Sequence, residues 1–117
     1  MGEVNSDRIV KFEWDKFVVS TPDNSFLQSW AWGLVQEEFG AEIWRLKENG
    51  SAALVIKREL LGRQNWLYIP RGPLGKYTNR ILMDQLVDLG REQKSLFIRI
   101  EPRKVPVGDW KKADHDI

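Results

Sequence analysis

Residues 41–70 of the chain read AEIWRLKENGSAALVIKRELLGRQNWLYIP. Three runs in this stretch are rich in apolar, β-branched and aromatic residues, which favour extended strands: 42–47, 52–60 and 66–69. Asn49-Gly50, between the first two runs, is a preferred sequence for a two-residue hairpin turn. The pattern therefore predicts an antiparallel meander of three strands, which ends at Pro70 because proline has no N–H to donate to a neighbouring strand.

A helix is predicted directly before the meander. Ser25 is a favourable N-cap, and Gln28 three residues later completes the sequence pattern of a capping box. Apolar residues at helical spacing continue to about Glu38, and Gly40 suits the turn that follows a helix. Further upstream, residues 15–19 predict a second, short helix.

A third helix and a last strand are predicted after the meander. Thr78 or Asn79 can cap the helix, which ends near Gln93, and residues 95–101 then alternate as a strand. Because this strand follows a helical crossover, it can pair in parallel with an earlier one. The order predicts an α+β domain with two to three helices and a mostly antiparallel sheet, one edge of which stays exposed.

Composition restricts the function. The formal net charge is +1, from 18 basic and 17 acidic residues, which disfavours a general nucleic-acid binder. The chain has no cysteine and a single histidine, His115, so we expect no disulfide, no thiol nucleophile, no metal and no cofactor. No apolar run approaches the roughly 20 residues that span a bilayer, and no secretory signal is evident, so a cytoplasmic location is expected.

Three motifs occur in a defined order: FLQSWAWG at 26–33, YIPRGP at 68–73 and RIEP at 99–102. Their order and spacing resemble the N-terminal part of the FemAB family, and the resemblance covers about residues 12–102. It implies an acetyltransferase-like (GNAT-like) half-domain. Members of this family are aminoacyltransferases of peptidoglycan and cell wall biogenesis. They move an amino acid from a charged tRNA to an amine of a nucleotide- or lipid-linked precursor, in the cytoplasm and in some cases at the inner membrane face.

Members of the family are several hundred residues long, so the resemblance also concerns domain organisation. We expect residues 1–102 to form an incomplete N-terminal subdomain and residues 103–117 to be a loop or disordered tail. The resemblance then implies that a C-terminal subdomain completes the enzyme, and that the chain alone is inactive. Its implied substrates are the peptidoglycan precursor and aminoacyl-tRNA.

Arg71 and Gly72 lie in the turn that ends the third predicted strand. In one interpretation the guanidinium is held rigidly to bind a phosphate or carboxylate through two hydrogen bonds, and the glycine lets the ligand approach the backbone. In the other, the turn is structural and its arginine pairs with a nearby carboxylate. Both residues are candidates for substrate binding.

Arg99 and Glu101 project from one face of the last predicted strand. In one interpretation they form a structural ion pair or contact the Gly72 loop. In the other, Arg99 binds substrate while Glu101 polarises the attacking amine or positions substrate, which makes Glu101 the one candidate catalytic residue. Gln28 and Trp32 are further substrate-binding candidates. The capping box and the apolar stripe of the helix explain these two residues without a ligand.

Two other function classes remain open. An acyl-CoA N-acyltransferase would need a glycine-rich loop whose amides bind pyrophosphate, and the nearest stretch, 71–75, loses one amide at Pro73. A non-enzymatic interaction module would use the exposed sheet edge to recruit a strand or to form a homodimer.

Overall fold

The computed structural model of the protein describes residues 2–75 and 79–102. One five-stranded sheet forms its centre: β1, β2, β3 and β5 are neighbours in that order, and β4 pairs with β2. The strands are β1 (Ile43–Glu48), β2 (Ser51–Glu59), β3 (Asn65–Ile69), β4 (Leu74–Gly75) and β5 (Ile98–Ile100). The predicted tail at 103–117 lies outside the described residues, as does Thr78, one of the two candidate caps.

The antiparallel meander is confirmed. β2 pairs antiparallel with both β1 and β3, and Gly50 in the first turn has a φ of 79°, a conformation that glycine adopts at little cost. The parallel pairing of the last strand is also confirmed, because β5 pairs in parallel with β3. Two details differ from the prediction: β5 is shorter than 95–101, and β4 lies in a segment for which no strand was predicted.

Within the described residues, three α-helices and one short 3-10 helix accompany the sheet. They are α1 (Gly2–Ser20), the 3-10 helix η1 (Phe26–Gln28), α2 (Trp30–Glu38) and α3 (Arg80–Glu92). The prediction of a short helix at 15–19 was wrong in length, because α1 has 19 residues. Its first half is mostly polar and carries no clear apolar period, so the sequence indicates only the part in which Trp14 and Val18 are buried.

The single helix predicted from Ser25 is divided in two. Ser25 caps η1 through a hydrogen bond from the N–H of Leu27, and Ser29 then caps α2 through a hydrogen bond from the N–H of Trp32. The predicted capping box is therefore wrong. The side chain of Gln28 bonds to backbone groups of the sheet and does not return to Ser25, because those buried groups need a partner more than an exposed helix end does.

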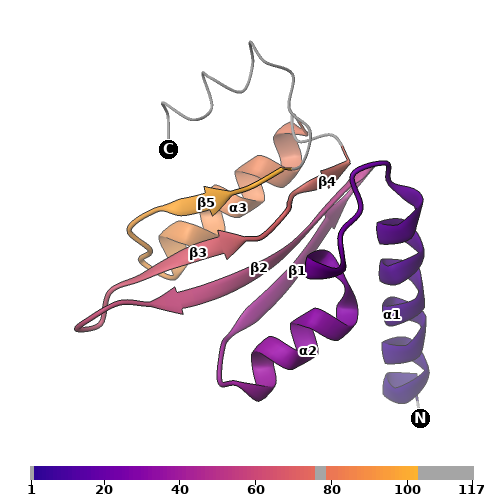
Figure 1. The fold of residues 1–117 in the computed structure, drawn as a ribbon, viewed down its shortest axis with the longest axis horizontal. Coiled ribbons are helices and arrows are strands. Elements are labelled where there is room, and N and C mark those ends of the chain that lie inside the picture. The colour runs from indigo at the N-terminus through magenta and orange to yellow at the C-terminus, as the bar shows by residue number, and fades with distance from the viewer. Residues whose placement is uncertain (1, 76–78, 103–117) are drawn as a thin grey trace.

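The elements form three layers (Figure 1). α3 covers one face of the sheet, whereas α1 and α2 lie against the other. The α3 side buries Ala53, Val55, Leu67, Ile69, Leu82, Leu86, Leu89 and Ile100. The α1–α2 side buries Trp14, Val18, Ala52, Leu54, Ile56 and Leu74. The alternation along β2 places successive residues in the two cores, as the strand period requires.

The α1–α2 layer covers its face of the sheet unevenly. Ile56 of β2 is fully buried beneath it, but Tyr68 lies opposite Ile56 and Arg99 opposite Tyr68, so all three point to this same face. Tyr68 is half-buried and Arg99 is exposed. Within 2–75 and 79–102, the helices therefore leave the β3–β5 half of this face accessible.

Candidate functional site

Two strands share one edge of β2 and leave an interval between them. β3 pairs with residues 56–59 of β2 and β4 pairs with residues 51–52, so Leu54 lies between the two. Gln28 occupies this interval with its side chain. Its Oε1 accepts a hydrogen bond of 2.7 Å from the N–H of Leu54, and its Nε2 lies 3.4 Å from the Leu54 carbonyl. The side-chain amide therefore takes the place of a strand backbone.

Gln28 also holds the turn that leaves β3. Its Nε2 donates a hydrogen bond of 2.7 Å to the carbonyl of Pro70, and the side chain is fully buried. The carbonyl of Gln28 accepts a hydrogen bond of 2.7 Å from Nε1 of Trp14 in α1. One residue thus joins α1, η1, β2 and the 70–73 turn, which gives the buried polar groups the partners that burial requires.

The 70–73 turn is packed tightly against Gln28. A Cβ at Gly72 would lie 2.9 Å from Cδ of Gln28 and 2.8 Å from Cγ2 of Ile69, closer than atoms can approach without displacement. The carbonyl of Gly72 accepts a hydrogen bond of 2.9 Å from the N–H of Glu101. The turn is therefore fixed to η1 on one side and to the end of β5 on the other.

Glu101 accepts hydrogen bonds on both of its carboxylate oxygens. Tyr68 donates its hydroxyl to Oε1 at 2.8 Å, and Arg99 donates Nε to Oε2 at 2.9 Å. Burial raises the pKa of Tyr68, and the hydrogen bond and negative charge of Glu101 raise it further, against smaller opposing effects of Arg99 and Arg58. The phenol therefore stays protonated as a donor, and the carboxylate is held in one orientation at the edge of the accessible half-face.

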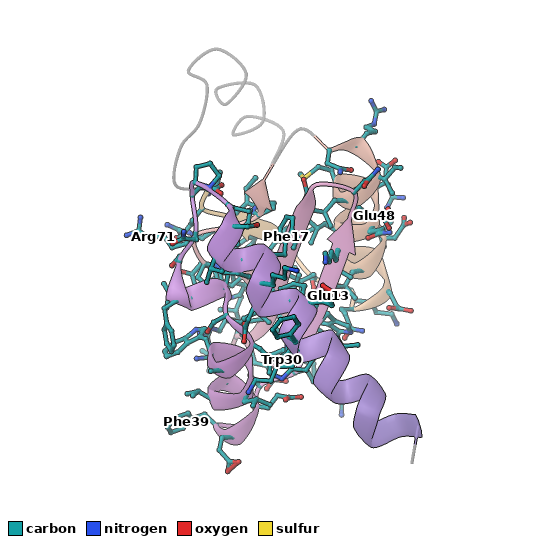
Figure 2. The ribbon with its side chains drawn as sticks, turned by 90° about the vertical axis from the view of Figure 1, so that its right-hand side faces the viewer. Glu13, Phe17, Trp30, Phe39, Glu48 and Arg71 are labelled. Atoms are coloured by element: carbon teal, nitrogen blue, oxygen red, sulfur yellow. The ribbon has the colours of Figure 1, made fainter. Side chains whose placement is uncertain are left out.

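Arg71 lies beside a pocket of about 430 Å³ that is also lined by residues 24–27. Its backbone has a φ of 56°, which is uncommon for a residue other than glycine, and its side chain projects from the edge of the molecule (Figure 2). Among the described residues, no ion pair includes Arg71. The guanidinium is therefore available to an anionic group that enters the pocket.

The structure gathers five of the six predicted site residues at one corner, where β3 and β5 end. They are Gln28, Arg71, Gly72, Arg99 and Glu101. The predicted ion pair between Arg99 and Glu101 is present. Trp32 lies apart from the other five: its ring contacts Phe26 edge to face with centroids 5.7 Å apart, and it packs against the α1–α2 core. Trp32 is connected to the pocket beside Arg71 through Phe26, one of the residues that line that pocket.

Sequence reasoning missed Tyr68 and Arg45. Arg45 stacks its guanidinium 3.6 Å from the ring centroid of Trp30 and donates Nη2 to the Trp30 carbonyl at 2.9 Å. A Cβ at Gly33 would collide with this guanidinium, so the glycine of the FLQSWAWG motif makes room for it. Asp15 of α1 accepts a hydrogen bond of 3.0 Å from the N–H of Trp30. Much of this motif thus attaches α2 to the sheet.

The charge of Arg45 is not fully compensated. Burial lowers its pKa, and the nearby carboxylates of Glu37 and Asp15 oppose that effect. Its Nε is buried and has no hydrogen-bond partner in the described part of the chain. We assign Arg45 to the packing of α2, since its guanidinium lies between that helix and β1.

Three α-helices and a mostly antiparallel five-stranded sheet define the described residues as an α+β protein. The FemAB family model matches residues 9–112, and the chain belongs to this family. Among solved structures, the crystal structure of FemX matches with a TM-score of 0.64 and 25% sequence identity. The match covers 80% of this chain and 26% of FemX, so the chain spans about a quarter of that protein. The search of curated proteins finds no match.

The membership confirms the family predicted from the three motifs, and the match to FemX confirms the predicted fold class. In the described residues, no helix combines the length and apolar character needed to cross a bilayer.

Proposed function

We propose that the chain is the N-terminal part of a tRNA-dependent aminoacyltransferase that adds amino acids to the peptide stem of a peptidoglycan precursor. Two observations support this proposal: the family match spans 9–112, and the two motifs at the ends of β3 and β5 meet through the hydrogen bond from Glu101 to Gly72. The corner so formed presents a cationic side chain, Arg71, on the fixed turn and an anionic side chain, Glu101, at the end of β5.

In the proposed reaction, the amine of the precursor attacks the ester carbonyl of the aminoacyl-tRNA. The new amide bond forms as the ester bond to the tRNA hydroxyl breaks, and the amine loses a proton. Glu101 orients this amine, accepts its proton directly or through water, and returns a proton to the leaving oxygen of the tRNA. Tyr68 and Arg99 are positioning residues, because they hold the carboxylate. No covalent intermediate on the protein is required, consistent with a chain that has no cysteine.

Arg71 would bind an anionic group of the precursor, either a phosphate or a carboxylate. The rigid turn limits the entropy lost on binding, and the guanidinium can form two parallel hydrogen bonds to either group. Gly72 leaves the backbone accessible beside it, Gln28 holds the turn in place, and Trp32 supports the pocket wall through Phe26.

We further infer that residues 1–102 form one subdomain of the enzyme and that a C-terminal subdomain supplies the remainder of the substrate cleft. The chain by itself is then inactive, and the complete protein works in the cytoplasm or at the inner membrane face. The proposal draws on the 26% coverage of FemX by this chain.

The test is transfer of a labelled amino acid from charged tRNA to nucleotide-linked and lipid-linked precursors, by the complete protein that contains this chain. Glu101→Gln should lower kcat about 100-fold or more, since general bases contribute roughly 10²–10⁴-fold. Arg71→Ala should chiefly raise KM for the precursor. Arg80→Ala, a substitution of an exposed arginine on α3, is the matched control. If the Glu101→Gln variant and the Arg71→Ala variant each keep full activity, this assignment of the site is refuted.

A second candidate, an interaction module, is favoured by one observation: β5 lies at the edge of the sheet and offers a row of backbone groups to another strand. It predicts a homodimer that Ile98→Pro abolishes, because the parallel register directs the N–H of Ile98 away from β3 and that of Arg99 towards it. Sedimentation at increasing concentration would detect the change.

A further inference from the structure

Four exposed apolar side chains lie at the end of β3 opposite to the 70–73 turn. Leu60 and Leu61, in the turn between β2 and β3, are 42% and 94% exposed, and Leu96 and Phe97, just before β5, are 56% and 41% exposed. Hairpin turns are usually built from glycine, asparagine, aspartate and serine, so two adjacent leucines there are unusual. We call these four residues the apolar end.

The two segments that carry the apolar end are neighbours in the fold. The N–H of Leu96 donates a hydrogen bond of 2.9 Å to the carbonyl of Asn65, the residue that begins β3 directly after the hairpin turn. The ring of Phe97 stacks on Trp66 with centroids 5.2 Å apart. The two apolar segments are therefore side by side, although they are more than 30 positions apart in the sequence. Figure 1 shows the β2–β3 hairpin extending beyond the helices at this end.

Cationic side chains surround the apolar end. Three cations, Arg63, Arg91 and Lys94, lie in or next to the segments that form the apolar end, together with two carboxylates, Glu59 and Glu92. Among the described residues, none of the three cations takes part in an ion pair. Arg91 and Lys94 also line a pocket of about 280 Å³ together with Phe97 and Ile98. The surface thus combines an apolar centre with a rim of net positive charge.

We propose that the apolar end docks on an anionic lipid surface. Leu60 and Leu61 insert at the level of the acyl-chain boundary, where burial of apolar area is favourable. Trp66 lies behind them, at the depth that amphipathic aromatic rings prefer, and the cations of the rim attract the lipid phosphates.

Charge complementarity selects this occupant over a second copy of the chain. A two-fold dimer through the apolar end would place one positive rim against another, which is repulsive. An anionic lipid surface neutralises the same rim.

The docking also keeps the candidate site away from the lipid. β3 separates Glu101 and the 70–73 turn from the apolar end by roughly 16 Å, the length of five extended residues. The inference does not depend on the proposed transfer reaction.

The experiment is co-sedimentation of the 117-residue chain with phosphatidylcholine vesicles, with and without phosphatidylglycerol. We expect binding to the vesicles that contain phosphatidylglycerol. The double substitution Leu60→Ser and Leu61→Ser should weaken that binding about tenfold or more, from the loss of two inserted side chains. Arg63→Gln with Lys94→Gln should weaken it by a similar factor, from the loss of two cations near the lipid surface.

Val19→Ser is the matched control, because Val19 is 70% exposed on α1 and lies away from the apolar end. It should bind as the unmodified chain does, and circular dichroism should show all variants folded. The proposal is overturned if the chain binds neither kind of vesicle or binds both equally. It is also overturned if Val19→Ser weakens binding as much as the double substitution of Leu60 and Leu61 does. It is also overturned if the chain self-associates without lipid through the same leucines, since a second copy would then be the occupant.

Discussion

The two turns at opposite ends of β3 differ in how they are held. The 70–73 turn receives hydrogen bonds from the side chain of Gln28 and from the backbone of Glu101, and a buried glycine lies at its centre. The turn at 60–64 is closed by one backbone hydrogen bond of 2.8 Å between Leu60 and Gln64, and Leu61 at its tip is 94% exposed. The first turn is held rigidly by its neighbours, whereas side chains in the second turn can be substituted without destabilising the core.

The largest effect should follow removal of the side chain that holds the first turn. Gln28→Ala leaves the buried N–H of Leu54 and the carbonyl of Pro70 without a partner and opens a cavity, so we expect a loss of about 3 kcal/mol or more in the free energy of unfolding. Urea denaturation measures this, with Gln64→Ala in the second turn as the control. A loss below about 1 kcal/mol would mean that water replaces the amide.

The next effect concerns the close contact within the first turn. Gly72→Ala should cost about 1–3 kcal/mol, because the new Cβ meets Gln28 and Ile69. The cost should fall by more than about 0.5 kcal/mol in a Gln28→Ala background, since one of the two obstructing side chains is then gone. Equal costs in both backgrounds would show that Gln28 does not determine the need for glycine.

A smaller effect should appear in the titration of Tyr68. In a Tyr77→Phe background, absorbance at alkaline pH should show Tyr68 ionising above the ordinary tyrosine value of about 10. Glu101→Gln should bring this pKa down towards the ordinary value, because the hydrogen bond to a carboxylate and its charge are removed. If Glu101→Gln leaves it unchanged, the hydrogen bond between the two residues is not formed in solution.

The same titration fixes the sign of the pH dependence of stability. The folded pKa of Tyr68 is raised, so the associated stability is fully present below the unfolded value and is lost as the pH rises through the folded value. The free energy of unfolding should therefore decline on the alkaline side more steeply for the unmodified chain than for Tyr68→Phe.

The smallest effect should come from the tip of the second turn. Leu61→Ser should change the free energy of unfolding by no more than about 0.5 kcal/mol, since the side chain is almost fully exposed. A loss comparable to that of Gly72→Ala would show that the two turns are held alike, and the comparison between them would fail.

Local signals made much of the fold predictable. Asn49-Gly50 indicated the first hairpin, and Asn79 indicated the start of α3, where its side chain accepts a hydrogen bond of 3.1 Å from the N–H of Leu82. The parallel pairing of β5 followed from the crossover helix. In each case the deciding residues lie within a few positions of the feature they determine, so the sequence displays the cause directly.

The arrangement of the site was less predictable because its contacts are not local. The Gln28 amide bonds to residues 26 and 42 positions away, and Gln28 in a capping box accounts equally well for the local pattern. Tyr68 meets Glu101 only because β3 and β5 adopt one particular parallel register. The YIPRGP and RIEP motifs identified the two segments that form the site, but the contact between these segments exists only in the folded sheet.

The side-chain amide inserted between β3 and β4 has a consequence for hydrogen exchange. The N–H of Leu54 is protected by Gln28 and not by a neighbouring strand, so it becomes exposed when η1 detaches, while the rest of β2 remains paired. Its exchange rate then reports the local opening of the candidate site separately from global unfolding. A ligand that orders the 70–73 turn would slow exchange at this one amide of a central strand.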